Sequence, residues 1–166
     1  MTRPERGMTQ RGLTQRATMA EAATLAALHQ KAFPPHEAWT RADFEALLAL
    51  ESTRAYASYQ DGACLGLLVL QCVADQAEIL TMATDPVARR QGLGRQILAH
   101  AAAEPASQTI KSWWLDVAAD NPGARAFYHE LGFQSDGRRP QYYKRLEGQR
   151  VDAILMSKQV GGQPTS

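Results

Sequence analysis

Apolar residues are spaced in two different ways along this chain, and the spacing predicts where helices and strands alternate. From residue 18 to residue 33 they recur every three or four positions, which is the spacing of a helix with one buried face. Thr18 and Glu21 form a capping box at its start. Pro34 and Pro35 follow, and proline cannot continue a helix. The first periodic segment is therefore expected to be a helix that ends before Pro34.

A second, shorter helix is expected to begin after Thr40. Thr40 and Asp43 are spaced as a capping box, with aspartate where glutamate or glutamine is usual. Trp39 and Phe44 occupy the two positions of a hydrophobic staple, in which the residue before the cap packs against one in the first turn. The stretch from Pro34 to Thr40 is therefore expected to be a loop between two helices.

The rest of the chain alternates β-rich runs with two further helical segments. One helix has Leu93, Ile97 and Ala101 on one side, and the other is opened by an Asn121 cap and closed at Gly132. Strands are expected at residues 53–59, 63–73, 77–84, 111–118, 133–138 and 151–158. With a first strand before the first helix, the order is β-α-α-β-β-β-α-β-α-β-β. This order predicts an α/β sheet with helices on both faces, and it differs from a regular doubly wound order.

Length and composition are those of one ordinary globular domain. The chain has 166 residues, of which 45% are hydrophobic and 21% charged, and its net charge is +1. We expect residues 13–160 to fold as one unit, with a disordered extension at 1–12 and a flexible tail at 161–166. The near-zero net charge gives no reason to expect nucleic acid or an anionic membrane as a partner.

Cysteine and histidine usage suggests neither disulfides nor a metal site. Cys64 and Cys72 lie in one predicted strand, eight residues apart, which is farther than a disulfide reaches. They are expected to be buried thiols of a reducing, cytoplasmic interior. The histidines have no metal-ligand spacing. We expect them on helix surfaces, and they are His29, His36, His100 and His129.

Gly92 and Gly94 stand between a predicted strand and a predicted helix. Glycine lets the backbone turn without a Cβ, and the free N–H groups of a helix start favour a phosphate. Arg89, Arg90 and Arg95 add positive charge around this loop. A solvated basic turn is the alternative, and for the glycines alone it would be the better interpretation. The loop is neither a Walker loop nor a dinucleotide fingerprint, because the lysine and the third glycine of those motifs are missing.

The glycine loop has the form R-x-x-G-x-G, and three further stretches accompany it in a characteristic order, beginning at Ala77, Trp114 and Ala126. Over about residues 13–158, the chain resembles the Gcn5-related N-acetyltransferases (GNAT), and within them the RimI-type ribosomal-protein-alanine acetyltransferases. The resemblance implies the GNAT fold, with a mixed, mostly antiparallel central sheet of about six to seven strands flanked by four helices. It also implies acetyl-CoA as co-substrate and no metal.

By this resemblance, the cofactor would be held by backbone groups at one strand end, by the glycine loop and by one asparagine. For Asn121 two interpretations stay open: its side chain binds the pantetheine amide, or it only caps its helix. The implied cofactor residues are Met82, Ala83, Thr84, Arg89, Arg90, Gln91, Gly92, Leu93, Gly94, Arg95 and Asn121.

Acetyl transfer to an amine needs a base for the amine and a donor for the leaving thiolate. The resemblance implies Tyr128 as the donor, in A-F-Y-x-x-L-G-F, and a core tyrosine is the alternative. Two carboxylates compete as base: Glu78, in A-E-I, and Asp116, which stands where the RimI type has a glutamate. We favour Glu78 as base and keep Asp116 as a water relay or a ligand of the acceptor amine.

The resemblance implies an acceptor groove between two loops. Phe33 and Trp39 lie in the loop between the first two helices, and Tyr142 and Tyr143 in the predicted loop between the last two strands. Pro35 and His36 stand after Pro34, where the RimI type usually has Trp-Ser. This difference affects the prediction of the acceptor more than that of the cofactor.

The expected acceptor is the N-terminal α-amine of a protein, acetylated directly in a ternary complex. A small-molecule amine is one alternative, and a non-catalytic acyl-CoA-binding module is another. As a working expectation, the protein acts as a monomer or weak dimer.

Overall fold

The computed structural model describes residues 12–161 of the chain. The expected extension at 1–12 and tail at 161–166 lie almost wholly outside the described residues.

The described strands are β1 (Leu13–Ala17), β2 (Thr53–Gln60), β3 (Ala63–Val73), β4 (Gln76–Thr84), β5 (Ser112–Ala118), β6 (Gln134–Lys144) and β7 (Arg150–Gln159). They form one seven-stranded sheet in the order β1-β2-β3-β4-β5-β7-β6. Every neighbouring pair is antiparallel except β4 and β5, which run parallel. The expected mixed, mostly antiparallel sheet is confirmed.

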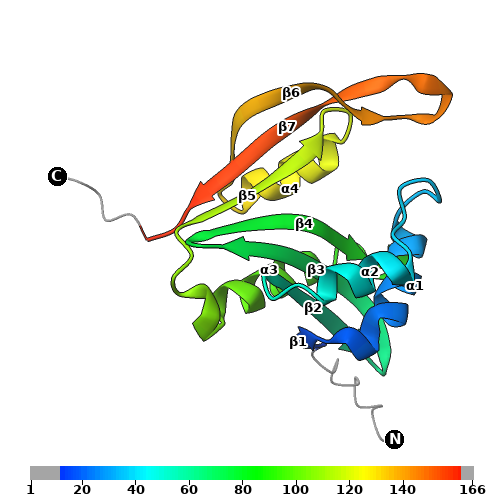
Figure 1. Cartoon of the computed structure of the whole chain (residues 1–166), viewed down its shortest axis with the longest axis vertical. Coiled ribbons are helices and arrows are strands. Elements are labelled where there is room, and N and C mark those ends of the chain that lie inside the picture. The colour runs from blue at the N-terminus through cyan, green and yellow to red at the C-terminus, as the bar shows by residue number, and fades with distance from the viewer. Residues whose placement is uncertain (1–11, 162–166) are drawn as a thin grey trace, which may run out of the picture.

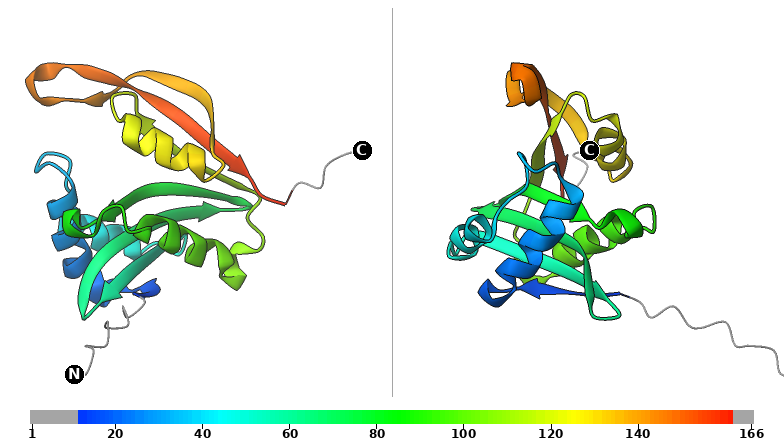
Figure 2. Two further views of the ribbon diagram at one scale, coloured as in Figure 1. Left: turned by 180° about the vertical axis from the view of Figure 1, so that it is seen from behind. Right: turned by 90° about the vertical axis from the view of Figure 1, so that its right-hand side faces the viewer.

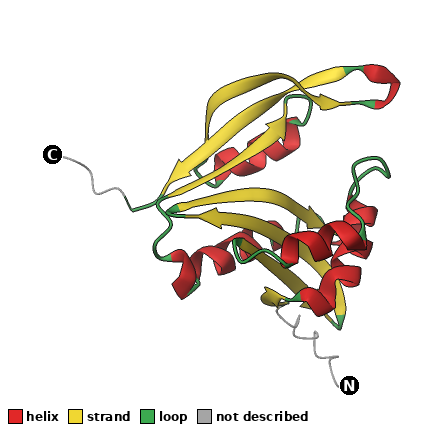
Figure 3. Cartoon of the chain, viewed as in Figure 1, coloured by secondary structure: helices red, strands yellow, loops and turns green. Residues whose placement is uncertain are grey.

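The described helices are α1 (Ala22–Ala32), α2 (Arg41–Leu48), α3 (Leu93–Ala103) and α4 (Pro122–Glu130). Figure 2 shows α1 and α2 on one side of the sheet and α3 and α4 on the other, and Figure 3 shows the same layering by element type. The predicted capping box of α2 is confirmed, since the Thr40 backbone N–H donates to Asp43 Oδ2 at 2.7 Å and Asp43 N–H donates to Thr40 Oγ1 at 3.2 Å. The Thr18 box opens a 3-10 turn, Met19–Glu21, directly before α1.

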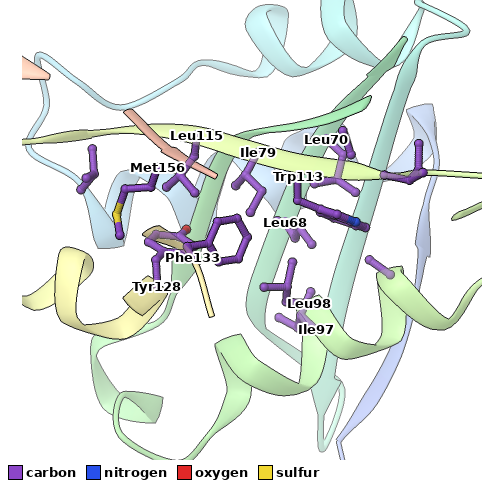
Figure 4. Close-up of a cluster of buried hydrophobic side chains, with 14 of the residues drawn as sticks. Leu68, Leu70, Ile79, Ile97, Leu98, Trp113, Leu115, Tyr128, Phe133 and Met156 are labelled. Carbon is purple, nitrogen blue, oxygen red and sulfur yellow. The ribbon is translucent and has the colours of Figure 1, made fainter. Parts of the chain in front are cut away.

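Two hydrophobic cores hold these layers together. The core beneath α3 and α4 contains Leu68, Ile79, Leu115 and Met156 from the strands, and Figure 4 shows it. The core beneath α1 and α2 is built around fully buried Phe44. Each face of the sheet therefore has its own apolar layer.

The two parallel strands at the centre of the sheet stay together over only three residue pairs, the last of which is Glu78 with Trp114. β4 continues to Thr84 and β5 to Ala118 without further pairing between them. Figure 1 shows the two strands diverging, with α4 alongside the opening. The opening leaves one backbone edge of the last residues of β4 unpaired, because their other edge is bonded to β3.

β4 carries a bulge at Leu80. Its register with β3 moves from Thr81 opposite Val69 to Ile79 opposite Leu70, so that Leu80 is an extra residue. As a result, the side chains of Leu80 and Thr81 both face α1 and α2: Leu80 packs in that core and Thr81 hydrogen-bonds to α1.

The prediction that Tyr142 and Tyr143 lie in a loop is wrong. β6 runs on to Lys144, well beyond the expected end of this strand. Its register with β7 shifts between Arg139 and Tyr143, and this irregularity accommodates Pro140, which cannot donate to a ladder. Both tyrosines are therefore held on a strand.

Candidate active site

Glu78 and Asp116 lie on the same face of the sheet, one on each side of the opening between β4 and β5. Leu115 and Val117 point into the core with α3 and α4, so Asp116 between them points the other way. The same alternation applies to Glu78, which lies between the core residues Ala77 and Ile79. The fold thus brings together the two carboxylates that compete as base.

Burial raises the pKa of both carboxyl groups. For Asp116, whose side chain is 11% exposed, desolvation is the main cause, and the Arg139 guanidinium lowers the pKa in part. For Glu78, desolvation again comes first, the charge of Asp116 adds to the rise, and Arg139 opposes it. The negative charge of Asp116 therefore disfavours ionisation of Glu78.

The Oδ1 atom of Asp116 is buried and has no hydrogen-bond partner among the described residues. Its nearest cation is Arg139, whose Nε lies 3.5 Å away. A buried oxygen without a donor is costly, so this atom is a ready acceptor for a ligand N–H group.

Two aromatic residues of β6 complete this face. The Tyr143 hydroxyl donates to the backbone carbonyl of Asp116 at 3.3 Å, and burial raises the pKa of Tyr143 to about 12. The Arg139 guanidinium lies 5.4 Å from the ring centre of Tyr142, a cation–π contact. The structure therefore gathers the predicted bases and the predicted acceptor tyrosines in one place.

Tyr128 lies on the opposite face, in the core beneath α4 (Figure 4). Its ring packs edge-on against Phe127 at 5.1 Å and Phe133 at 5.5 Å, measured between ring centres. Its side chain is buried, and burial raises the pKa of its hydroxyl. The core position is thus observed for Tyr128, and its role as a donor to the thiolate stays a prediction.

The glycine loop turns as the sequence predicts, but its two glycines serve different needs. Gly92 caps α3 with a left-handed φ of 77°, and Arg90 before it also has a positive φ, 64°. Gly94 is inside the helix, and a Cβ there would lie 3.2 Å from Cζ of Phe127. Gly92 shapes the turn, while Gly94 lets α3 approach α4.

The cationic side chains of the glycine loop differ in their contacts. Arg89 and Arg90 are exposed, and an Arg89 Nη atom donates to the carbonyl of Ala32 at 3.5 Å. Arg95 forms an ion pair of 3.8 Å with Glu130, which links α3 to α4.

Asn121 caps α4 in this structure. Its Oδ1 accepts the N–H of Ala124 at 3.1 Å, so the side-chain oxygen is engaged in the cap. The side-chain amide group keeps its donors for another partner.

The loop between α1 and α2 contacts the β6–β7 hairpin through Arg145. The Arg145 guanidinium donates two hydrogen bonds to the Asp120 carboxylate, from Nη2 at 2.7 Å and from Nε at 3.0 Å. Its Nη1 donates to Glu37 Oε1 at 3.1 Å. The contact spans the two sides of the expected acceptor groove.

Three of the six basic residues of the β6–β7 hairpin form ion pairs with carboxylates. Arg138 forms a 2.8 Å ion pair with Asp152, as Arg139 does more loosely with Asp116. Among the acidic partners only Asp152 lies on the hairpin itself, so carboxylates of other elements supply the remaining pairs.

Within residues 12–161, no three side chains of the metal-ligating types come together. A cleft of about 610 Å³ lies between α3 and strands β1 to β3, away from Glu78 and Asp116, and its lining of hydroxyl and amide groups includes Ser58, Gln91 and Gln96. None of the helices in the described part of the chain has the length and hydropathy needed to cross a membrane.

A model of the acetyltransferase (GNAT) family matches residues 22–133. The chain belongs to this family. Several curated GNAT relatives are named [Ribosomal protein bS18]-alanine N-acetyltransferase. The one from Escherichia coli K12 is 39% identical over 98 residues, which is 59% of this chain and 66% of the relative. The one from Haemophilus ducreyi is 27% identical over 93 residues, 56% of this chain and 64% of the relative. The match therefore spans just under two thirds of these relatives' own length.

Solved GNAT structures match over nearly the whole described fold. The ribosomal-protein-S18-alanine N-acetyltransferase from Escherichia coli superposes with a TM-score of 0.81 at 28% identity, covering 93% of this chain and 99% of the other. Arabidopsis thaliana NAA60 in complex with acetyl-CoA has a TM-score of 0.77 at 16% identity, covering 91% and 99%. The second likeness shows the fold alone.

Sequence reasoning missed three features of the site. The Leu80 bulge has no residue signature beyond two adjacent apolar positions, Ile79 and Leu80. The Arg145 contact joins residues far apart in the chain. The third is His29, which was expected on a helix surface but is buried at 1% exposure.

Proposed function

We propose that this protein transfers the acetyl group of acetyl-CoA to the N-terminal α-amine of a protein, as the ribosomal-protein-alanine enzymes among its relatives are named for doing. One observation carries the proposal. The opening between β4 and β5 has an unpaired strand edge beside the glycine loop, and a pair of carboxylates stands on its α1/α2 face. Action as a monomer or weak dimer in the cytoplasm is part of the same proposal.

The chain's own groups fit acetyl-CoA. The free edge of β4 at Met82, Ala83 and Thr84 offers backbone donors and acceptors that suit the amides of the pantetheine arm. The N–H groups of the first turn of α3, from Leu93 onward, suit the pyrophosphate, and the exposed Arg89 and Arg90 add charge. In this proposal the Asn121 side-chain amide donates to the pantetheine while its oxygen keeps capping α4.

The carboxylates would prepare the acceptor. An α-amine has a pKa of about 8, against about 10.4 for lysine, so a weak base is enough. Glu78 is the favoured base, since its raised pKa brings it closer to that of the amine. Asp116 has a buried oxygen that receives no hydrogen bond from residues 12–161, which suits a ligand of the acceptor ammonium or a water relay.

Tyr128 would assist the leaving thiolate by donating a hydrogen bond. An ordinary tyrosine, with a pKa of about 10, gives its proton to a thiolate of about 8.5 only uphill, by roughly 2 kcal/mol. Burial raises the pKa of Tyr128 further. A strong hydrogen bond, with the proton retained on the tyrosine, therefore fits this residue better than full transfer.

A small amine is the second candidate acceptor, and one contact favours it. The Arg145–Glu37 ion pair bridges the two sides of the groove, and a closed groove suits a small substrate better than a chain. A binding module without catalysis is disfavoured by the carboxylate pair and Tyr128.

Thiol release from acetyl-CoA, measured with a pool of N-terminal peptides and a pool of small amines, tests the proposal. Turnover with peptides that begin with alanine or serine is expected. Turnover with small amines only would show that the acceptor is a small amine and not a protein N-terminus. Tight acetyl-CoA binding without turnover in either pool would favour the binding module.

A further inference from the structure

His29 is a buried residue whose two ring nitrogens both have partners. It lies in the last turn of α1. The backbone N–H of Trp39 donates to its Nδ1 at 3.0 Å, and its Nε2 lies 3.0 Å from Oγ1 of Thr81. Because Nδ1 accepts, the ring proton is on Nε2 and is donated to Thr81.

The two partners of His29 belong to the two halves of the proposed site. Trp39 lies in the loop between α1 and α2, and Thr81 follows the Leu80 bulge of β4, next to the strand edge proposed for the cofactor. No covalent path shorter than about forty residues joins these segments, so the imidazole is a direct link between them.

Aromatic stacking fixes the same imidazole. The ring centre of His29 lies 4.2 Å from that of Phe33 and 5.1 Å from that of Trp39, with interplanar angles of 21° and 17°. Phe44 of α2 meets it edge-on at 5.7 Å. Phe33 and Trp39 are the loop residues that the resemblance places in the acceptor groove. The imidazole that stacks against both of them is therefore also hydrogen-bonded to Thr81 of β4.

We propose that His29 is a positioning residue for acetyl transfer, which holds the acceptor loop against the bulge of β4 so that acceptor and thioester meet in a fixed geometry. This inference rests on the proposed function. Burial lowers the pKa of His29 to about 4, with the carboxylate of Asp43 opposing, so the ring stays neutral and keeps both bonds near neutral pH.

The test compares four variants. His29→Phe keeps an aromatic ring and removes both hydrogen bonds, whereas His29→Gln retains a donor and an acceptor. Thr81→Val removes only the acceptor of the Nε2 proton. His129→Gln, on the exposed side of α4, is the matched control.

We expect His29→Phe to raise the KM for the acceptor peptide by roughly tenfold or more, since small misplacements in a site are costly. The dissociation constant for acetyl-CoA should stay within about twofold, Thr81→Val should show a smaller effect of the same kind, and His29→Gln should recover part of it. His129→Gln should behave as the wild type.

An unchanged acceptor KM in His29→Phe overturns the inference. So does a parallel loss of acetyl-CoA binding, kcat and melting temperature, which indicates a purely structural role.

Two measurements need no acceptor. Nitrogen-15 NMR of the free enzyme should show the Nε2–H tautomer at His29, and amide hydrogen exchange at Trp39 should speed up by roughly tenfold or more in His29→Phe. If wild-type enzyme acetylates no peptide, the proposed function fails, and the tautomer and Trp39 exchange still decide whether the link exists. If His29→Phe does not fold, Thr81→Val and His29→Gln carry the test.

Discussion

The Arg139 guanidinium lies 3.5 Å from the buried Oδ1 of Asp116, on the face of the sheet that also carries Glu78. It lowers the pKa of both carboxyl groups against the rise that burial causes. One cation on β6 therefore partly offsets the desolvation that disfavours ionisation of two carboxylates on β4 and β5.

Replacing Arg139 by glutamine should move the acidic limb of the kcat/KM profile to higher pH. The positive charge favours the ionised carboxylates, so its loss raises their pKa, and the base becomes available only at higher pH. The pH–rate profile with a peptide that has a free N-terminal amine measures this. Arg138→Gln, which breaks the separate pair with Asp152, should leave the limb in place. A limb that moves to lower pH in Arg139→Gln would contradict the assignment.

Asp116→Asn should lower turnover and raise the melting temperature. The pKa of Asp116 is higher in the folded state than in the unfolded state. Ionising Asp116 therefore lowers the free energy of unfolding: the loss grows as the pH rises from the unfolded pKa to the folded pKa, and it stays constant at higher pH, including neutral pH. Asparagine removes that charge, and a gain of about 2–4 °C corresponds to about 1 kcal/mol in a domain of this size. Thermal unfolding at pH 7 and at low pH, where both proteins are uncharged at this site, checks the sign: the difference should vanish at low pH.

Tyr128→Phe should reduce kcat by on the order of 10²-fold while acetyl-CoA binding stays intact. The phenylalanine keeps the edge-on packing against Phe127 and Phe133. Tyr56→Phe is the control, because the Tyr56 hydroxyl bonds to Glu104 at 2.7 Å, far from the site, and its loss should cost about 1 kcal/mol of stability without a comparable loss of turnover. A decrease of less than threefold in Tyr128→Phe would remove this residue from the mechanism.

The two loop glycines should respond differently to alanine. Gly92→Ala meets open space but forces a side chain into a left-handed conformation, at a cost of roughly 1–2 kcal/mol of folding stability. Gly94→Ala puts a Cβ 3.2 Å from Cζ of Phe127, so the Phe127 ring must move by a few tenths of an ångström. Calorimetric titration with acetyl-CoA and thermal unfolding should show weaker binding in both variants. Equal binding by Gly94→Ala and wild type would show that the α3–α4 spacing does not matter to the cofactor.

Glu37→Gln should lower the KM for peptide acceptors and leave the KM for acetyl-CoA unchanged. The substitution weakens the ion pair to Arg145 that bridges the groove, while Arg145 keeps both bonds to Asp120. Initial rates over a range of peptide concentrations measure it. A higher peptide KM would show instead that the bridge helps to build the acceptor site.

Local patterns in the sequence were sufficient for the elements whose cause is local. The α2 capping box and the turn at Gly92 depend on neighbours within a few residues, and both formed where the pattern predicts them. The alternation along β5 likewise predicts that Asp116 points away from its apolar neighbours. The order of elements along the chain also followed from local patterns, and the mixed, mostly antiparallel sheet was implied by the family motifs, which span most of the chain.

The relationships that make a site were decided by tertiary structure. Strand register brings Asp116 beside Arg139, the Leu80 bulge turns Thr81 toward α1, and burial between loop and strand gives His29 its partners. A histidine in an isolated helix pattern looks like a surface residue, because nothing in its neighbours tells what packs over it. Propensity and capping act over a few residues, whereas register, desolvation and hydrogen bonds across the sheet exist only once distant segments have met. That difference in range is why the sequence determined the elements and the cofactor loop, and only the fold determined the carboxylate pair and the imidazole link.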